Sequence, residues 1–151
     1  MKLNIKLDDS VKIKSPIYSF VLKQKIISVI NKIGRDRFDK VKWIIFDAKN
    51  LNKRKFSSLL NIPSVYIVRQ GKDYGFCIYE ECEIWISTVT IQSSGLFEQN
   101  IKTLVPELNN SDFLADVIID ELTHIMTGKD HGSKEYDMQF NEYHNRYYNR
   151  L

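Results

Sequence analysis

The order of apolar and polar residues along the chain predicts an α+β fold that begins with a strand and a helix. Residues 3–7 alternate apolar and polar side chains, as in a short, half-buried strand. Ser15 and Pro16 suit a helix start, because serine can cap free amide groups and proline at the first helical position loses no hydrogen bond. Gly34 suits the end of this helix. Its apolar residues are expected largely on one side: Phe20, Ile26, Ile27, Ile30 and Ile33.

Four further apolar runs predict strands in the middle of the chain. Residues 41–46 are expected to form a mostly buried strand, and residues 65–68 form a second run soon after Pro63. Residues 74–79 and 83–88 are expected to pair as a hairpin through an acidic turn. Together these runs predict a mixed or antiparallel sheet.

Two helices are expected toward the C-terminal end. Residues 112–127 carry apolar side chains at helical spacing, and Gly128 suits the end of that helix. A last helix is expected to start near Ser133, and its aromatic residues repeat at spacings of four, three and four. We interpret this aromatic stripe as core packing, in preference to a platform for nucleobases: Tyr136, Phe140, Tyr143 and Tyr147.

This order of elements predicts a single α+β domain that spans residues 1–151, with the sheet packed against the N-terminal helix and helix 112–127. Hydrophobic residues make up 43% of the chain and charged residues 27%, values typical of soluble globular proteins. No apolar run is long enough to span a membrane, and the N-terminus lacks the apolar stretch of a secretion signal. We therefore expect a cytoplasmic protein with no membrane partner.

Cys77 and Cys82 are the two cysteines of the chain, and both lie in the predicted hairpin. A single pair in a chain of this length is not a disulfide framework, and the spacing does not match a C-x-x-C motif. We interpret both residues as free thiols that are buried or half-buried.

Basic residues are concentrated in the first part of the chain. Residues 1–60 contain 15 Lys and Arg against 5 acids, a net charge of +10, whereas residues 61–151 contain 7 against 14, a net charge of −7. Such a split is typical of a surface that meets nucleic acid or another polyanion. Lysines that only keep an exposed face soluble would also explain it, so nucleic acid is one candidate partner.

Asp120, Glu121 and His124 form the pattern that carries the candidate chemistry. On a helix, positions 120 and 124 lie on the same face one turn apart, so their side chains can hold one metal ion together. Glu121 is displaced by about 100° around the axis, where it can stand beside a metal-activated water without binding the ion. Gly128 lets the chain turn after the helix, so that His131 can supply a third ligand and leave a fourth position open.

This pattern resembles the zinc-peptidase signature His-Glu-x-x-His with a third histidine downstream. His131 and Gly132, followed by Tyr136, are similar to the segment after the active-site helix in SprT-like and related small metallohydrolases. The hairpin of residues 74–87 is similar to the one that stands beside this helix in SprT-like and minimal gluzincin-like zincins, where its edge strand holds an extended substrate. The resemblance covers residues 74–140.

The resemblance implies a zinc-dependent metalloprotease that hydrolyses peptide bonds in a protein or peptide substrate. Asp120, His124 and His131 would hold one Zn²⁺, and Glu121 would act as the general base. Tyr136 is a candidate for stabilising the tetrahedral oxyanion. SprT-like enzymes act on DNA-bound proteins, and the basic N-terminal region would bring this chain to nucleic acid in a similar way.

Asp120 departs from the family pattern, in which the first ligand is histidine. A carboxylate oxygen can bind zinc, but its negative charge makes the ion a weaker Lewis acid. Two histidines and one carboxylate are also the Fe(II) ligands of a class of oxygenases, so another divalent metal stays open.

Two alternatives to a metalloprotease remain. One is a catalytically inactive zincin-like binding module for a macromolecular partner, of viral or mobile-element origin. The other is a simple surface pair between Asp120 and His124.

Overall fold

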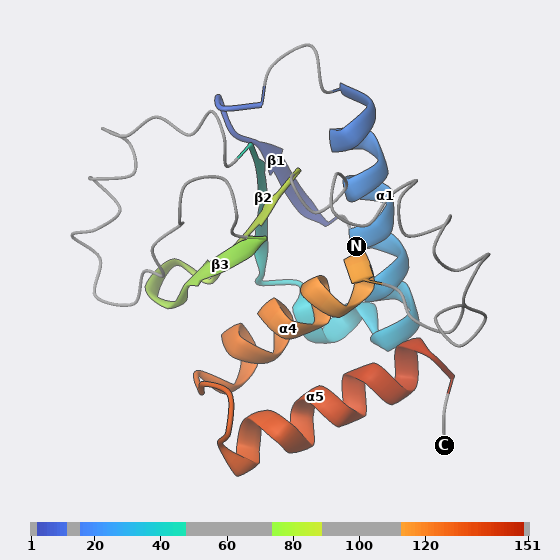
Figure 1. The fold of residues 1–151 in the computed structure, drawn as a ribbon, viewed down its shortest axis with the longest axis vertical. Coiled ribbons are helices and arrows are strands. Elements are labelled where there is room, and N and C mark those ends of the chain that lie inside the picture. The colour runs from blue at the N-terminus through green and yellow to red at the C-terminus, as the bar shows by residue number, and fades with distance from the viewer. Residues whose placement is uncertain (1–2, 12–15, 48–73, 89–112, 150–151) are drawn as a thin grey trace, which may run out of the picture.

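The computed structural model describes residues 3–11, 16–47, 74–88 and 113–149, and within them it shows an α+β fold (Figure 1). A four-stranded mixed sheet is accompanied by one N-terminal and two C-terminal α-helices, which confirms the predicted fold class. None of the described helices combines the length and the apolar character that crossing a bilayer requires. The elements are β1 (Asn4–Leu7), α1 (Pro16–Ile33), the 3-10 helix η1 (Arg35–Phe38), β2 (Lys42–Phe46), β3 (Gly75–Ile78), the 3-10 helix η2 (Tyr79–Glu81), β4 (Glu83–Ser87), α4 (Phe113–Thr127) and α5 (Lys134–Tyr147).

The sheet has the strand order β1-β2-β4-β3. β1 is parallel to β2 and β2 is parallel to β4, whereas β3 is antiparallel to β4, as expected for two strands joined by a short turn. β3 therefore lies at one edge of the described sheet, where it contacts α4. The predicted hairpin of residues 74–88 is confirmed, and η2 forms its acidic turn. The strand predicted at residues 65–68 lies outside the described residues.

α1 packs against α4 and the sheet through one apolar face. The prediction that Phe20 belongs to this face is wrong, because Phe20 is 62% exposed. Phe20 lies two residues before Leu22, about 200° away around the helix axis, and so points away from the core. The buried residues of α1 follow helical spacing: Leu22, Ile26, Val29, Ile30 and Ile33.

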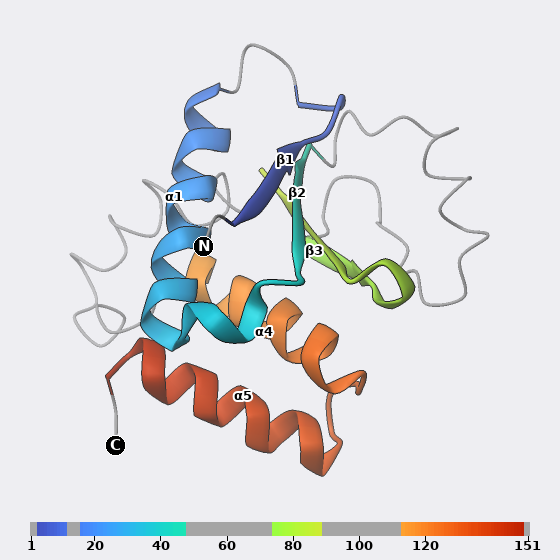
Figure 2. The same cartoon turned by 180° about the vertical axis from the view of Figure 1, so that it is seen from behind.

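α4 lies between α5 and the strands, and both views of the chain show this arrangement (Figure 1, Figure 2). α5 is capped by Ser133, whose side-chain oxygen accepts a hydrogen bond of 3.1 Å from the backbone N–H of Tyr136. Tyr143 packs edge-to-face on Phe38 with 5.5 Å between ring centroids. The aromatic stripe of α5 is thus part of the core, as predicted, and its buried members are Tyr136, Tyr143 and Tyr147.

β3 approaches both β4 and α4 closely at Gly75. A Cβ atom at this position would lie 2.7 Å from the carbonyl oxygen of Trp85, 3.2 Å from Cδ1 of Ile86 and 3.3 Å from Cγ of Glu121. The first of these contacts is with backbone and is shorter than a Cβ atom tolerates. The absence of a side chain at residue 75 therefore lets the hairpin lie against α4 at the position of Glu121.

Replacing Gly75 with alanine should destabilise the fold. We expect Gly75→Ala to lower the free energy of unfolding by about 1–3 kcal/mol, the usual cost of overpacking a tight interior. Urea denaturation followed by circular dichroism would measure the change. An unfolding midpoint equal to that of the wild type would contradict the close packing of the hairpin on α4.

Candidate metal centre

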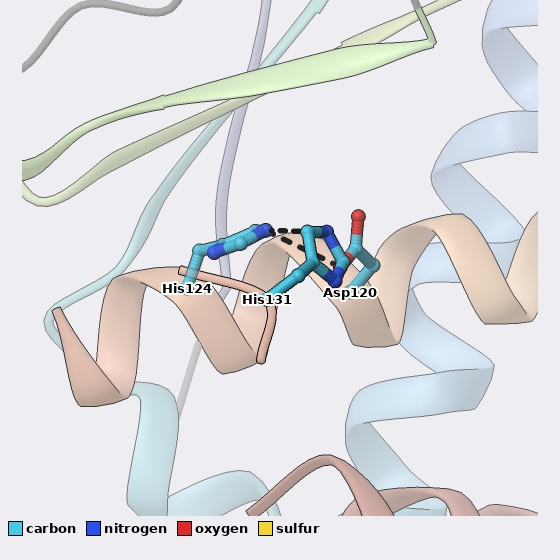
Figure 3. A group of neighbouring side chains, drawn as sticks. All are labelled: Asp120, His124 and His131. Carbon is cyan, nitrogen blue, oxygen red and sulfur yellow. Dashed lines mark hydrogen bonds and ion pairs between the residues drawn. The ribbon is translucent and has the colours of Figure 1, made fainter. Parts of the chain in front are cut away.

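Asp120 and His124 lie one turn apart on α4, and His131 follows the end of that helix (Figure 3). Gly128 ends the helix with a φ of 66°, the left-handed conformation that glycine adopts readily, while its N–H still bonds to the carbonyl of His124 at 2.8 Å. The chain then turns again at Gly132, where φ is 89°. The turn at Gly128 brings the three predicted ligands together in one group, which we call the metal cluster, and the turn at Gly132 leads into α5.

The ligand atoms of the metal cluster converge on one point. Nε2 of His124 lies 3.2 Å from Nε2 of His131, and Oδ1 of Asp120 lies 3.3 Å from each of these nitrogens. A tetrahedral zinc ion with bonds of about 2.0–2.1 Å separates its ligand atoms by about 3.3–3.4 Å. The spacing therefore fits a single metal ion, and two imidazoles with one carboxylate suit zinc as well as other divalent metals.

The metal cluster is buried on one side and open on the other. The side chain of His124 is 7% exposed, that of Asp120 is 28% exposed and that of His131 is 68% exposed. The packed core therefore holds His124 in place, while the side of the cluster that carries His131 is accessible to water.

The ring of His124 is oriented by the loop that follows α4. Its Nδ1 lies 2.8 Å from the carbonyl oxygen of Lys129, and we assign the Nδ1 proton as the donor to that oxygen. In the neutral ring this assignment leaves the lone pair of Nε2 directed toward Asp120 and His131. Histidine ligands in metal sites are commonly held by such a second hydrogen bond, which sets both the tautomer and the ring orientation.

Tyr136 reaches the metal cluster from α5. Its hydroxyl donates a hydrogen bond to Oδ1 of Asp120. Its ring centroid lies 4.9 Å from that of His124 and 4.6 Å from that of His131. The residue predicted as an oxyanion stabiliser is therefore beside the site, and its hydroxyl is directed at a candidate ligand oxygen.

Interactions within the cluster move the pKa values of Asp120 and His124 apart. Burial opposes the charged form of both side chains. The hydrogen bond to Asp120, the Lys129 carbonyl and the charge of Asp120 outweigh burial and raise the pKa of His124 to about 9. Hydrogen bonds from His124 and Tyr136 likewise outweigh burial and lower the pKa of Asp120 below its usual value. At neutral pH the metal-free cluster therefore holds a proton that a metal ion would replace.

Glu121 lies where α4 meets β3, and it is 8% exposed. Its Oε2 accepts a hydrogen bond from the thiol of Cys77, with 3.0 Å between Sγ and Oε2. Cys77 is buried and Cys82 is half-buried, and both are free thiols, as predicted. The pairing of Cys77 with Glu121 was not predicted, because the alternation within the hairpin indicates a buried face but not which helix covers it.

A second polar cluster lies one turn earlier on α4. Nε2 of His144 lies 3.3 Å from Oδ1 of Asp116, and the hydroxyl of Tyr148 donates to the same oxygen at 2.9 Å. In the described part of the chain, only the metal cluster brings three potential ligands together. Asp116, His144 and Tyr148 are therefore matched controls for the residues of the metal cluster.

Comparisons with known proteins do not place the chain in a family. No family model matches the sequence, and no curated protein or solved structure matches it either. What the structure shows is a group of three side chains, Asp120, His124 and His131, whose ligand atoms are close enough to hold one metal ion.

The raised pKa of His124 predicts that metal affinity depends on pH. Because the ion must replace the proton of this ring, the apparent association constant should rise by up to about tenfold per pH unit while His124 is protonated. It should level off above pH 9, where the ring is neutral. Competition titrations with a chromogenic chelator at several pH values would measure the profile. The His144→Gln variant should keep this profile, and a flat profile in the wild type would contradict it.

Removing the hydroxyl of Tyr136 should weaken metal binding. We expect Tyr136→Phe to lower the affinity by about 10- to 100-fold, the usual effect of losing a hydrogen bond that orients a metal ligand. The aromatic ring that packs on the two histidines is kept, so the fold should not change. Isothermal titration calorimetry would compare this variant with Tyr148→Phe, which removes a matched hydroxyl from Asp116. Equal affinities in Tyr136→Phe and the wild type would exclude an orienting role for the hydroxyl.

Proposed function

We propose that this chain binds one zinc ion through Asp120, His124 and His131 and hydrolyses peptide bonds at that site. The observation that carries the proposal is the spacing of the three ligand atoms, which lie 3.2–3.3 Å apart, the separation expected around one tetrahedral zinc ion. Glu121 follows the first ligand on the same helix, as the general base does in the zincin signature that the motif resembles. Three protein ligands leave a further position for water or substrate.

Glu121 takes the role of general base in this proposal. A bound zinc ion supplies Lewis acidity, which lowers the pKa of a water and polarises a carbonyl group. The Glu121 carboxylate accepts the proton of the attacking water and passes it to the leaving amine. Because α4 is packed on both sides, the carboxylate has a defined place between the helix and β3.

Tyr136 supports the site in a different way from the one predicted from the sequence. Its single hydroxyl proton is donated to Asp120, so it holds that carboxylate in the orientation that places Oδ1 beside the histidines. Stabilisation of an oxyanion by Tyr136 stays a prediction, and it requires the hydroxyl to turn away from Asp120.

The substrate in this proposal is an extended segment of a protein or peptide. β3 is an edge strand of the described sheet and contacts α4, which carries the metal cluster. An extended peptide can pair with such an edge through main-chain hydrogen bonds. This arrangement agrees with the use of the hairpin in the zincins that the sequence resembles. Binding of nucleic acid by the basic residues 1–60 stays a prediction.

A non-catalytic binding module is the second candidate. One observation favours it: Asp120 stands where the family has histidine. In this case the edge of β3 would bind a macromolecular partner without cleaving it.

Metal content and hydrolysis measured on the same preparations would test the proposal. We expect tag-free wild-type protein to contain one zinc ion, as three-ligand sites do, and we expect His124→Ala to lose it while His144→Ala keeps it. Zinc-loaded protein should release fluorescent fragments from labelled, unfolded casein. Glu121→Gln should slow this release by at least about 100-fold, the contribution of a general base, whereas Glu135→Gln on the exposed face of α5 should not.

The outcomes separate the candidates. Wild-type protein that binds zinc in the metal cluster but cleaves nothing would favour the binding module. Equal rates in Glu121→Gln and the wild type would remove Glu121 from the mechanism, and the absence of bound metal after reconstitution would contradict the site itself. Metal analysis by mass spectrometry also identifies the ion. Iron in place of zinc would favour the alternative in which the same three ligands hold Fe(II), as in a class of oxygenases.

A further inference from the structure

Cys77 connects the edge strand to the residue proposed as the general base. It lies on β3, it is fully buried, and its Sγ is 3.0 Å from Oε2 and 3.3 Å from the backbone oxygen of Glu121. The two residues are 44 positions apart in the sequence. No role in metal binding or hydrolysis described above requires a thiol at this place.

The direction of this hydrogen bond follows from the chemistry of the two groups. A thiol has one proton and can donate to one acceptor at a time, and a carboxylate is a stronger acceptor than a backbone carbonyl. Burial, followed by the neighbouring charge of Glu121, raises the pKa of the Cys77 thiol far above its ordinary value. The thiol therefore keeps its proton and donates it toward the carboxylate.

The backbone of β3 gives this donor a defined position. Cys77 is paired with Ile84 and Gly75 with Ile86 in the ladder between β3 and β4. Residues 75 and 77 lie on the same face of the strand, because side chains alternate along a strand. Gly75 leaves room for Cγ of Glu121, and Cys77 binds the end of that side chain. The Glu121 side chain therefore packs against Gly75 and is hydrogen-bonded by Cys77, and both residues belong to a strand that is paired with β4.

We propose that Cys77 is a positioning residue that holds the Glu121 carboxylate in the orientation needed for proton transfer. A glutamate side chain has several rotatable bonds, and the thiol restricts them by binding one carboxylate oxygen. This inference rests on the proposed function, because positioning matters for the reaction only if Glu121 is its general base.

The consequences for the reaction differ from those of losing a metal ligand. Cys77→Ala should lower kcat by about 10- to 100-fold, since small misplacements of a catalytic group cost rates of this order. KM and the zinc dissociation constant should not change, because Cys77 is not part of the metal cluster. Cys77→Ser should restore most of the rate, because a hydroxyl can donate from nearly the same place. Cys82→Ser is the matched control and should behave as the wild type.

Infrared spectroscopy would test the contact itself on metal-free protein. Thiol S–H stretching absorbs where other protein groups do not, and it shifts to lower frequency when the thiol donates a hydrogen bond. In Cys82→Ser, the remaining band belongs to Cys77 and should lie at the frequency of a strongly bonded thiol. Adding Glu121→Gln should move it toward the frequency of a weakly bonded thiol, because a neutral amide accepts less strongly.

The two readouts distinguish failure of this inference from failure of the proposed function. A Cys77 band at the frequency of a free thiol, or one that Glu121→Gln does not move, would overturn the positioning contact whatever the enzyme does. Hydrolysis at an unchanged rate in correctly folded Cys77→Ala would overturn its role in the reaction. If Cys77→Ala does not fold, a rate in Cys77→Ser as low as that of Glu121→Gln would also overturn it. Wild-type protein that binds zinc but cleaves no peptide would instead overturn the proposed hydrolysis.

Discussion

The burial of α4 is the constraint on which the rest of the structure depends. α1, α5 and the hairpin of β3 and β4 all pack against this helix. Its apolar residues Ile118, Ile119 and Leu122 are fully buried, so rotation about its axis would expose them and open a gap in a close-packed interior. The direction of each polar residue on α4 follows from this. Glu121 faces β3, while Asp120 and His124 meet the loop that carries His131.

The same burial requires the polar groups of α4 to have partners, because an unpaired buried polar group costs about 1–3 kcal/mol. The hydroxyl of Thr123 donates to the carbonyl of Ile119 at 2.7 Å, within the helix. The other partners come from three different elements. His124 is bound to the loop after the helix, Asp120 to Tyr136 on α5, and Glu121 to the hairpin. The candidate site is thus assembled by the packing of α4. Each of these hydrogen bonds also joins a neighbouring element to α4.

Aspartate at position 120 changes the electrostatics of the cluster relative to the three-histidine pattern that the motif resembles. A carboxylate beside His124 favours the charged imidazole and raises the pKa of that ring to about 9. Without metal, the proton and the hydrogen bond from Tyr136 offset the negative charge. A divalent cation would take over that role. The carboxylate therefore adds a negative charge to the ligand set, and this charge leaves a bound ion a weaker Lewis acid.

The sequence by itself determined the features that depend on local spacing. The spacing of apolar residues and the residues that begin and end helices predicted the α+β class and the three described α-helices. The i, i+4 separation of Asp120 and His124 and the glycine after that helix predicted the residues that form the metal cluster. These features are local because helices repeat every 3.6 residues and strands every two. Only the tertiary structure decided the strand order β1-β2-β4-β3, the outward direction of Phe20 and the partners of Tyr136 and Cys77. Cys77 and Glu121 are 44 residues apart, and their contact depends on how the elements pack around α4, which the periodicity of no single segment encodes.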